Sequence, residues 1–333
     1  MPDPTKLKVA RHLDRPGICF GMSRVPGSGR VYFGASDAKV YEVDLTAEKP
    51  EAIELPGQHS GYVMGVALAG ASVISGAYDG KLIWRDTATR TVVRTVSAHS
   101  RWIRGVVASP DGRLVASVAD DMDCKLWNVE TGELVHTLQG HAKLTPTHFP
   151  SMLYCCAFSP DGLFLATADK VGHVVIWEVA TGQSLATLEA PVMYTWDPRQ
   201  RQHSIGGIRS LAFSQDGTQL AVGGTGQIGN IDHLEALARV EVFTWHDGQR
   251  THEFPGDKSK GLVERMAFHP QGDWLACAGG DHGGFIQFYD LRANKLLHQD
   301  TAPMHIYDFS LSESLDTLYA SGHGKLATFE FKA

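Results

Sequence analysis

The sequence contains little that would point to export, to a membrane or to a metal centre. Its 333 residues include five cysteines, and no two of them have the spacing of a zinc motif. No run of 18 apolar residues is present, which excludes a membrane-spanning helix, and the N-terminus lacks the apolar core of a signal peptide. We therefore expect a cytoplasmic protein with free thiols, no metal and no cofactor.

An excess of basic residues is also absent. The chain has 30 Lys and Arg against 37 Asp and Glu, which gives a formal net charge of −7. Proteins that bind nucleic acid broadly use clustered Lys and Arg to neutralise phosphates, so the acidic balance disfavours a nucleic-acid reader. The hydrophobic fraction of 43% is ordinary for a globular protein, and a chain of this length can bury a large core.

Glycine, by contrast, is abundant, with 35 residues, and it recurs in tight-turn sequences. Four such turns lie between short apolar runs, at residues 109–112, 159–162, 214–217 and 269–272. Pro presets φ for the first turn position, and Gly accepts the positive φ that a side chain would resist. The pattern predicts short antiparallel strands joined by turns.

An internal repeat organises these strands. An aromatic residue flanked by apolar and polar residues recurs at intervals of 40 to 66 residues, most clearly within residues 82–86, 125–129 and 175–179. The seven aromatic anchors are Tyr41, Trp84, Trp127, Trp177, Phe243, Tyr289 and Phe329. Seven repeats of four short strands predict an all-β, seven-bladed β-propeller that occupies residues 1–333 as a single domain.

The repeats resemble those of the WD-repeat family over nearly the whole chain. The resemblance implies a polar network within a blade, made by a His, a Ser or Thr, an Asp and the anchor Trp. The third repeat carries His99, Ser117, Asp121 and Trp127, and the second carries His59, Ser75, Asp79 and Trp84 with a turn one residue shorter. The fourth has Thr167, Asp169 and Trp177, while His141 lies far upstream. Because the set recurs at the repeat spacing, we interpret it as structural and not as a hydrolase triad.

The last blade is expected to borrow a strand from the N-terminus. The chain ends directly after the seventh anchor, whereas an unassigned strand, residues 6–13, precedes the first repeat. Pairing of this segment beside Lys325–Phe331 would complete the seventh blade, close the ring and remove an exposed strand edge.

Three long connections are predicted on one face, which the family calls the top. They span residues 140–153, 190–208 and 225–239, and long loops over a rigid scaffold are typical of recognition surfaces. The middle loop contains residue types common in interface hot spots: Tyr194, Trp196, Arg199 and Arg201. The alternative is that Tyr194 and Trp196 pack onto the blade edge. The third loop contains a predicted short helix over residues 230–239, which either packs on the propeller or docks a partner.

Aromatic and arginine residues also gather where the inner strands begin on the same face. They are Tyr62, Trp102, Arg104, Tyr154, Arg209, Arg265 and Tyr307. The resemblance implies partner binding at such positions, and the residue types suit a peptide with an acidic or aromatic anchor. For each position, a solvated or locally packed side chain is the alternative.

The leading hypothesis is a non-catalytic scaffold that binds a protein or peptide on the top face and the long loops of blades three to five, as a monomer within a larger assembly. The alternative is a hydrolytic or lactonase-like propeller enzyme with a metal in the central channel. That enzyme needs a ring of ligands, and the inner strands offer only Glu264 and Asp308 as acidic residues.

Overall fold

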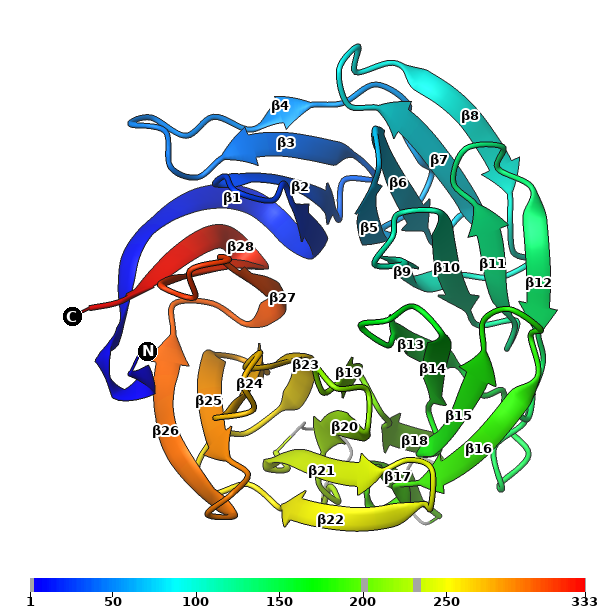
Figure 1. The fold of residues 1–333 in the computed structure, drawn as a ribbon, viewed down its shortest axis with the longest axis vertical. Coiled ribbons are helices and arrows are strands. Elements are labelled where there is room, and N and C mark those ends of the chain that lie inside the picture. The colour runs from blue at the N-terminus through cyan, green and yellow to red at the C-terminus, as the bar shows by residue number, and fades with distance from the viewer. Residues whose placement is uncertain (1–2, 199–202, 230–234, 333) are drawn as a thin grey trace.

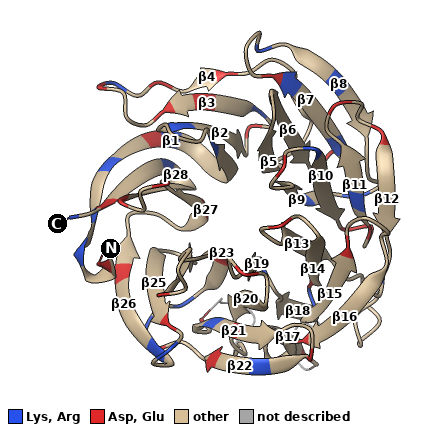
Figure 2. Cartoon of the chain, in the orientation of Figure 1, with Lys and Arg blue, Asp and Glu red and all other residues tan. Residues whose placement is uncertain are grey.

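The polypeptide forms a ring of antiparallel sheets around a common centre (Figure 1). The computed structural model describes residues 3–198, 203–229 and 235–332. In each four-stranded sheet the first strand lies nearest the centre and the last lies at the rim, which is the arrangement of β-propeller blades (Figure 1). Lys and Arg are interspersed with Asp and Glu around the ring (Figure 2).

Five blades have four strands each, in chain order. The first two are β5 (Val63–Ala69), β6 (Ser72–Ala77), β7 (Lys81–Asp86) and β8 (Val92–Ser97), then β9 (Ile103–Ala108), β10 (Leu114–Ala119), β11 (Cys124–Asn128) and β12 (Leu134–Leu138). The third is β13 (Leu153–Phe158), β14 (Phe164–Asp169), β15 (His173–Glu178) and β16 (Ser184–Glu189). The last two are β19 (Ser210–Phe213), β20 (Gln219–Thr225), β21 (Ala238–Thr244) and β22 (Gln249–Phe254), then β23 (Leu262–Phe268), β24 (Leu275–Gly280), β25 (Gly284–Asp290) and β26 (Lys295–Ala302).

The ring has six blades, and the prediction of seven is wrong. The repeats anchored at Tyr41 and Phe329 are not separate, because they form one six-stranded sheet. Its order is β27 (Ile306–Leu311), β28 (Thr317–Phe331), β1 (Leu7–Arg24), β2 (Arg30–Ala35), β3 (Val40–Asp44) and β4 (Ile53–Glu54). The 18-residue strand β1 joins the two repeats, since its first half pairs with β28 and its second half with β2.

The shared strand β1 bends where its partner changes. Residues 7–14 pair antiparallel with residues 325–331, which is the pairing expected for the N-terminal segment, and Cys19 begins the pairing with β2. Between them, Gly17 has φ +80°, and a Cβ there would lie 2.6 Å from Ser36 Oγ. The same hydroxyl accepts a hydrogen bond from the N–H of Ile18. Glycine at this position therefore lets one strand serve both halves of the sheet.

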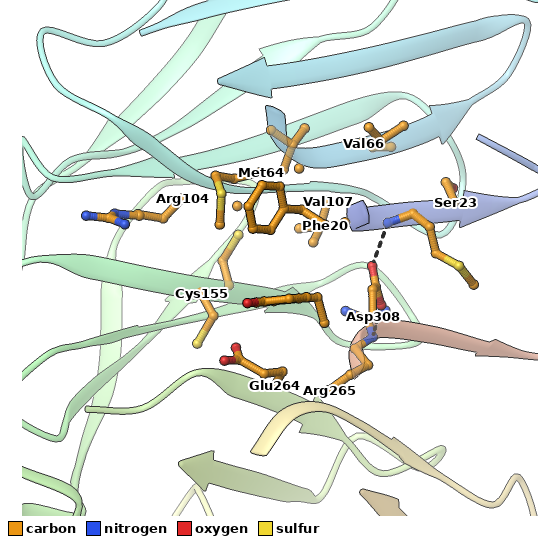
Figure 3. A pocket seen from close by; sticks show the side chains of 18 of the residues that line it. Phe20, Ser23, Met64, Val66, Arg104, Val107, Cys155, Glu264, Arg265 and Asp308 are labelled. Atoms are coloured by element: carbon orange, nitrogen blue, oxygen red, sulfur yellow. Dashed lines mark hydrogen bonds and ion pairs between the residues drawn. The ribbon is translucent and has the colours of Figure 1, made fainter. Parts of the chain in front are cut away.

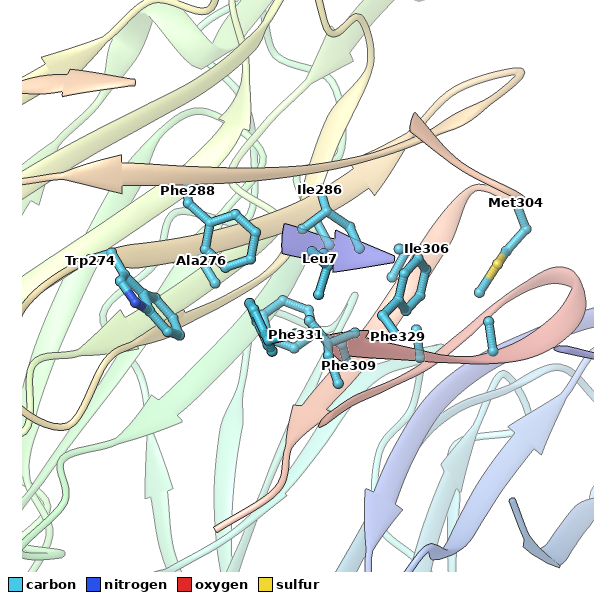
Figure 4. Close-up of a cluster of buried hydrophobic side chains, with 14 residues drawn as sticks. Leu7, Trp274, Ala276, Ile286, Phe288, Met304, Ile306, Phe309, Phe329 and Phe331 are labelled. Atoms are coloured by element: carbon cyan, nitrogen blue, oxygen red, sulfur yellow. The ribbon is translucent and has the colours of Figure 1, made fainter. Parts of the chain in front are cut away.

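The N-terminal strand is also part of a hydrophobic core. Leu7 is buried against the aromatic side chains Phe288, Phe329 and Phe331 (Figure 4). These residues come from β1, β25 and β28, so the cluster joins the six-stranded sheet to the neighbouring β23–β26 blade. Equivalent clusters fill the five other blade interfaces. Because each blade packs between two others, its middle strands are buried on both faces.

Helical structure is minor among the described residues. It consists of the 3-10 turns η1 (Pro4–Lys6) and η2 (Pro191–Met193), and no helix there is long and apolar enough to cross a membrane. The helix predicted over residues 230–239 is wrong where it can be compared: Leu237 bridges Lys260, and β21 begins at Ala238. Residues 230–234 lie outside the described residues. An additional hairpin, β17 (Tyr194–Asp197) with β18 (His203–Gly206), was not predicted.

Candidate functional site

The inner strands surround a central cavity of about 420 Å³ (Figure 3). Every blade contributes to its wall. The charged and aromatic residues that line it are Phe20, Arg104, Tyr154, Arg209, Glu264, Arg265, Tyr307 and Asp308. Five of the seven residues predicted at the channel mouth are therefore in this wall, and Tyr62 and Trp102 lie beside it.

A continuous chain of aromatic rings borders one side of the cavity. We call it the aromatic arc, and its members in order of contact are Tyr307, Phe20, Tyr62, Tyr78 and Trp102. The ring centroids are 5.1, 5.8, 5.5 and 4.4 Å apart along this order. Tyr62 and Trp102 are nevertheless 46% and 48% exposed. The arc therefore holds two aromatic faces rigidly in solvent.

Sequence reasoning missed Phe20 and Tyr78, and a positional signal could have found Tyr78. The N–H of Tyr78 bonds to the carbonyl of Tyr62 just beyond β6. Asp120 and Lys170 make the same backbone bond beyond β10 and β14, to Trp102 and Met152. In these three blades, the residue that follows the second strand therefore points to the same rim as the residue that precedes the first.

Two arginine side chains, Arg104 and Arg209, occupy the next part of the rim. Arg104 donates to both oxygens of Asp120, at 2.8 and 2.7 Å, and to the Tyr78 hydroxyl at 2.7 Å. Its guanidinium carbon lies 5.7 Å from the centre of the Tyr154 ring. The Arg209 guanidinium carbon lies over the same ring at 3.5 Å. Tyr154 is thus shared by two cations.

The two acidic residues of the inner strands are already engaged. Asp308 forms an ion pair with Arg265 at 3.1 Å and accepts the N–H of Met22 (Figure 3). Burial raises the pKa of Asp308. Glu264 lies 3.6 Å from His305 Nε2. Among the described residues, no group of three or more His, Cys, Asp or Glu could hold a metal ion.

Away from the cavity, polar networks connect the strands of three blades. In the β9–β12 blade, His99 Nδ1 lies 3.0 Å from Asp121 and its Nε2 lies 2.8 Å from Ser117 Oγ, which accepts the Trp127 indole N–H at 2.9 Å. The β13–β16 blade has the same arrangement of His141, Asp169, Thr167 and Trp177. The position of His141 far upstream in sequence therefore does not remove it from the network, because the long loop returns it to the blade.

The network of the β5–β8 blade differs from the prediction. His59 contacts Asp79 and Ser75 as expected from the repeat, but Trp84 Nε1 is buried without a hydrogen-bond partner. Arg85 donates to Ser75 Oγ instead, at 2.7 Å. In register, Arg85 opposite Val73 corresponds to Trp127 opposite Val115. The assignment of Trp84 to the network is wrong by one residue, as the shorter turn shifts the alignment.

The His–Asp pairs predict acid sensitivity. Burial acts to raise the pKa of Asp79 and Asp121, but hydrogen bonds and charge from His59 and His99 lower each to about 2. A lowered folded-state pKa gives stability that is present above the unfolded value of 3.8 and is lost as the pH falls toward 2. Urea unfolding between pH 6 and pH 2.5 should show this loss. Asp121→Asn should lower stability at pH 6 and flatten the pH dependence, whereas an unchanged slope would contradict the assignment.

The long loops pack against each other. Phe149 and Trp196 have ring centroids 5.1 Å apart, and Thr147 Oγ1 lies 3.4 Å from the Tyr194 hydroxyl. Both Tyr194 and Trp196 are half-buried on the strand β17. These contacts favour the alternative in which Tyr194 and Trp196 pack onto the propeller, over the prediction that both are free to bind a partner. Arg199 and Arg201 lie outside the described residues.

A family model described as "WD domain, G-beta repeat" matches residues 90–128, 132–178, 196–228 and 248–290. Telomerase protein component 1 of Mus musculus is 28% identical over 256 residues, which are 77% of this chain and 8% of that protein. WD repeat-containing protein SL1-17 of Schistosoma mansoni is 27% identical over 228 residues, 68% of this chain and 63% of that protein. Nuclear distribution protein PAC1-2 of Uncinocarpus reesii is 36% identical over 97 residues, 29% of this chain and 20% of that protein.

This chain spans less than two thirds of each of these relatives. Two of the matched segments, residues 90–128 and 132–178, contain the complete His, hydroxyl, Asp and Trp networks of the β9–β12 and β13–β16 blades. With its ring of four-stranded blades and its repeated polar networks, the chain belongs to the WD-repeat β-propeller family.

Proposed function

We propose that this protein is a non-catalytic scaffold that binds a protein or peptide partner on the face that carries the aromatic arc. The observation behind the proposal is that Tyr62 and Trp102 are about half exposed although each is held by ring contacts. Aromatic side chains that are already fixed lose little conformational entropy on binding. They therefore suit the centre of an interface.

A groove that begins at Trp102 supports the proposal that this face binds a partner. It lies between the β9–β12 and β13–β16 blades, has a volume of about 580 Å³ and includes Trp102, Leu144 and Met152 in its wall. Leu144 and the nearby Phe149 are 50% and 42% exposed. Apolar surface that is contiguous and exposed is typical of protein interaction sites. We infer that a partner segment extends from the cavity mouth along this groove.

A role within a larger assembly is part of the proposal. Telomerase protein component 1 is, by its name, one component of an assembly, and its similarity extends over 77% of this chain. The carboxylates of the cavity are used in contacts with Arg265, His305 and backbone, and no observation on the described residues favours the hydrolytic alternative.

The interface can be tested by comparing Trp102→Ala with Leu163→Ala. Leu163 is 58% exposed and lies in the turn between β13 and β14, at the opposite end of the strands. Removing a hot-spot aromatic costs about 2 kcal/mol or more, so Trp102→Ala should weaken partner capture from source lysate at least tenfold. Leu163→Ala should capture the wild-type set. Equal loss in both variants, or no loss in Trp102→Ala, would contradict the proposed face, provided that thermal melts show intact folds.

A further inference from the structure

Two cations, Arg209 in the cavity wall and Lys170 beside it, have no ionic partner among the residues that the structure describes. Arg104 is paired with Asp120, and Arg265 with Asp308. Within the described part of the chain, neither Arg209 nor Lys170 forms an ion pair or donates a side-chain hydrogen bond. The protein as a whole has a net charge of −7, so two adjacent unpaired cations are not a consequence of overall composition.

Arg209 is positioned by an aromatic ring and not by an acid. Its guanidinium carbon lies 3.5 Å from the centre of the Tyr154 ring, and it lines the cavity. Its Nε is buried without a hydrogen-bond partner. A buried guanidinium donor without an acceptor is energetically costly, and an incoming oxyanion would satisfy it.

Lys170 is the more deeply placed of the two cations. The residue is only 6% exposed, and burial lowers the pKa of its ammonium group. Arg209 and Arg104 add repulsion, which Tyr194 and the carboxylate of Asp120 oppose. An ammonium group in so sheltered a position would gain from an additional negative charge.

Gly207 lets the backbone lie close to both Tyr154 and Lys170. Gly207 has φ +100°, and a Cβ there would lie 2.9 Å from both the Tyr154 ring and the Cα of Lys170. Any other residue would displace the ring that supports Arg209. Glycine thus keeps Lys170, Tyr154 and Arg209 together as one sector of the rim.

We propose that Lys170 and Arg209 bind a phosphomonoester carried by the protein or peptide partner. A phosphomonoester has a charge close to −2 at neutral pH and three acceptor oxygens, which match two unpaired cations with their free donors. A single carboxylate would leave one positive charge uncompensated. This inference rests on the proposed function, because it names the group that the same face recognises, and it places that group beside the aromatic arc.

The test uses three small probes with the full chain: N-acetyl-phosphoserine methylamide, N-acetyl-glutamate methylamide and inorganic phosphate, at constant ionic strength. Binding is followed by calorimetry and by the shift of the Gly207 amide in ¹H–¹⁵N spectra. The phosphoserine probe should bind at least tenfold more tightly than the glutamate probe and more tightly than inorganic phosphate. Glutamate binding of equal strength would overturn the phosphate assignment, and equal binding of inorganic phosphate would overturn recognition of an ester.

Charge-removing variants locate the site. Arg209→Gln and Lys170→Met should each weaken phosphoserine binding at least tenfold, and Arg113→Gln, whose side chain is 84% exposed on a distant turn, should change it less than twofold. Binding within twofold of wild type in both rim variants would overturn the proposal. Lys170→Met keeps the length and volume of the buried side chain, and a thermal melt shows that the variant is folded.

Partner capture separates this inference from the scaffold proposal. Loss of the partner from Arg209→Gln and from phosphatase-treated lysate would support the phosphate site. If Arg209→Gln still captures the partner and Trp102→Ala does not, the phosphate site is refuted and the scaffold proposal stands. Retention by both variants would refute both.

Discussion

Deletion of residues 1–14 is expected to destabilise the whole ring and not only one end of it. The deletion removes the partner of residues 325–331 and takes Leu7 out of an aromatic core. Burial of one leucine contributes about 2 kcal/mol and each lost hydrogen bond about 1 kcal/mol, so the total is on the order of 5 kcal/mol or more. The melting temperature should fall by about 10 °C in a single transition.

A pair of point variants makes the same test without deletion. Leu7 and Val9 lie on the same strand, but Leu7 is buried while Val9 is 44% exposed. Leu7→Ala should lower the free energy of unfolding by about 2–4 kcal/mol, because it opens a cavity in a packed core. Val9→Ala should change it by less than about 0.5 kcal/mol. An unchanged melting temperature after deletion of residues 1–14 would show that β1 does not close the ring.

Replacement of Arg85 by Ala is expected to cost about 3–5 kcal/mol of unfolding free energy, measured by urea denaturation. The side chain is fully buried and donates to Ser75 Oγ and to the carbonyls of Pro56 and Gly57. The variant leaves these acceptors unpaired and opens a cavity, and both effects are destabilising.

Arg85→Trp tests the equivalence with Trp127. An indole at this position should donate to Ser75, as Trp127 donates to Ser117, and should recover at least half of the loss seen with Ala. Arg113→Ala serves as the exposed control, with an expected change below about 0.5 kcal/mol. If Trp were no better than Ala, the bonds to Pro56 and Gly57, and not the bond to Ser75, would account for the role of Arg85.

Arg85 also shows where sequence reasoning stops. The repeat, its turns and its aromatic anchors predict the strands, because turn residues act locally and recur. They do not determine which of two neighbouring residues enters the network. Trp84 and Arg85 are both fully buried, since the middle strands of a blade are covered on both faces. The usual alternation of buried and exposed positions, which would reveal a shift of one residue, is therefore missing.

The number of blades could not be predicted for a related reason. Anchor residues count repeats, whereas the number of sheets depends on where hydrogen bonding is interrupted. At Gly17 the chain bends without breaking the ladder, so two repeats share one strand. The prediction of a helix over residues 230–239 was wrong at its described end, because the bridge between Leu237 and Lys260 is a non-local contact that overrides local helix propensity.

Part of the candidate site could be predicted from the sequence. The strand starts placed Tyr62, Trp102, Arg104 and Tyr154 around one opening, because inner strands of a propeller converge. Tyr78 and Lys170 were missed, since they follow second strands and reach the rim only through backbone bonds to the residues that precede the first strands. That Lys170 has no acidic partner within the described ranges is a property of three-dimensional packing, which no local sequence pattern reveals.

The shared strand β1 also determines when the ring can form. Leu7 pairs with Phe331, so the closing contacts join residues more than 300 positions apart. During synthesis the β1 segment emerges before the other strands of the ring, and its partner, residues 325–331, is made after almost all the blades. Long-range strand pairing is slow and leaves apolar edges exposed meanwhile. We therefore expect ring closure to be a late step in the folding of this chain, because it must wait for residues 325–331.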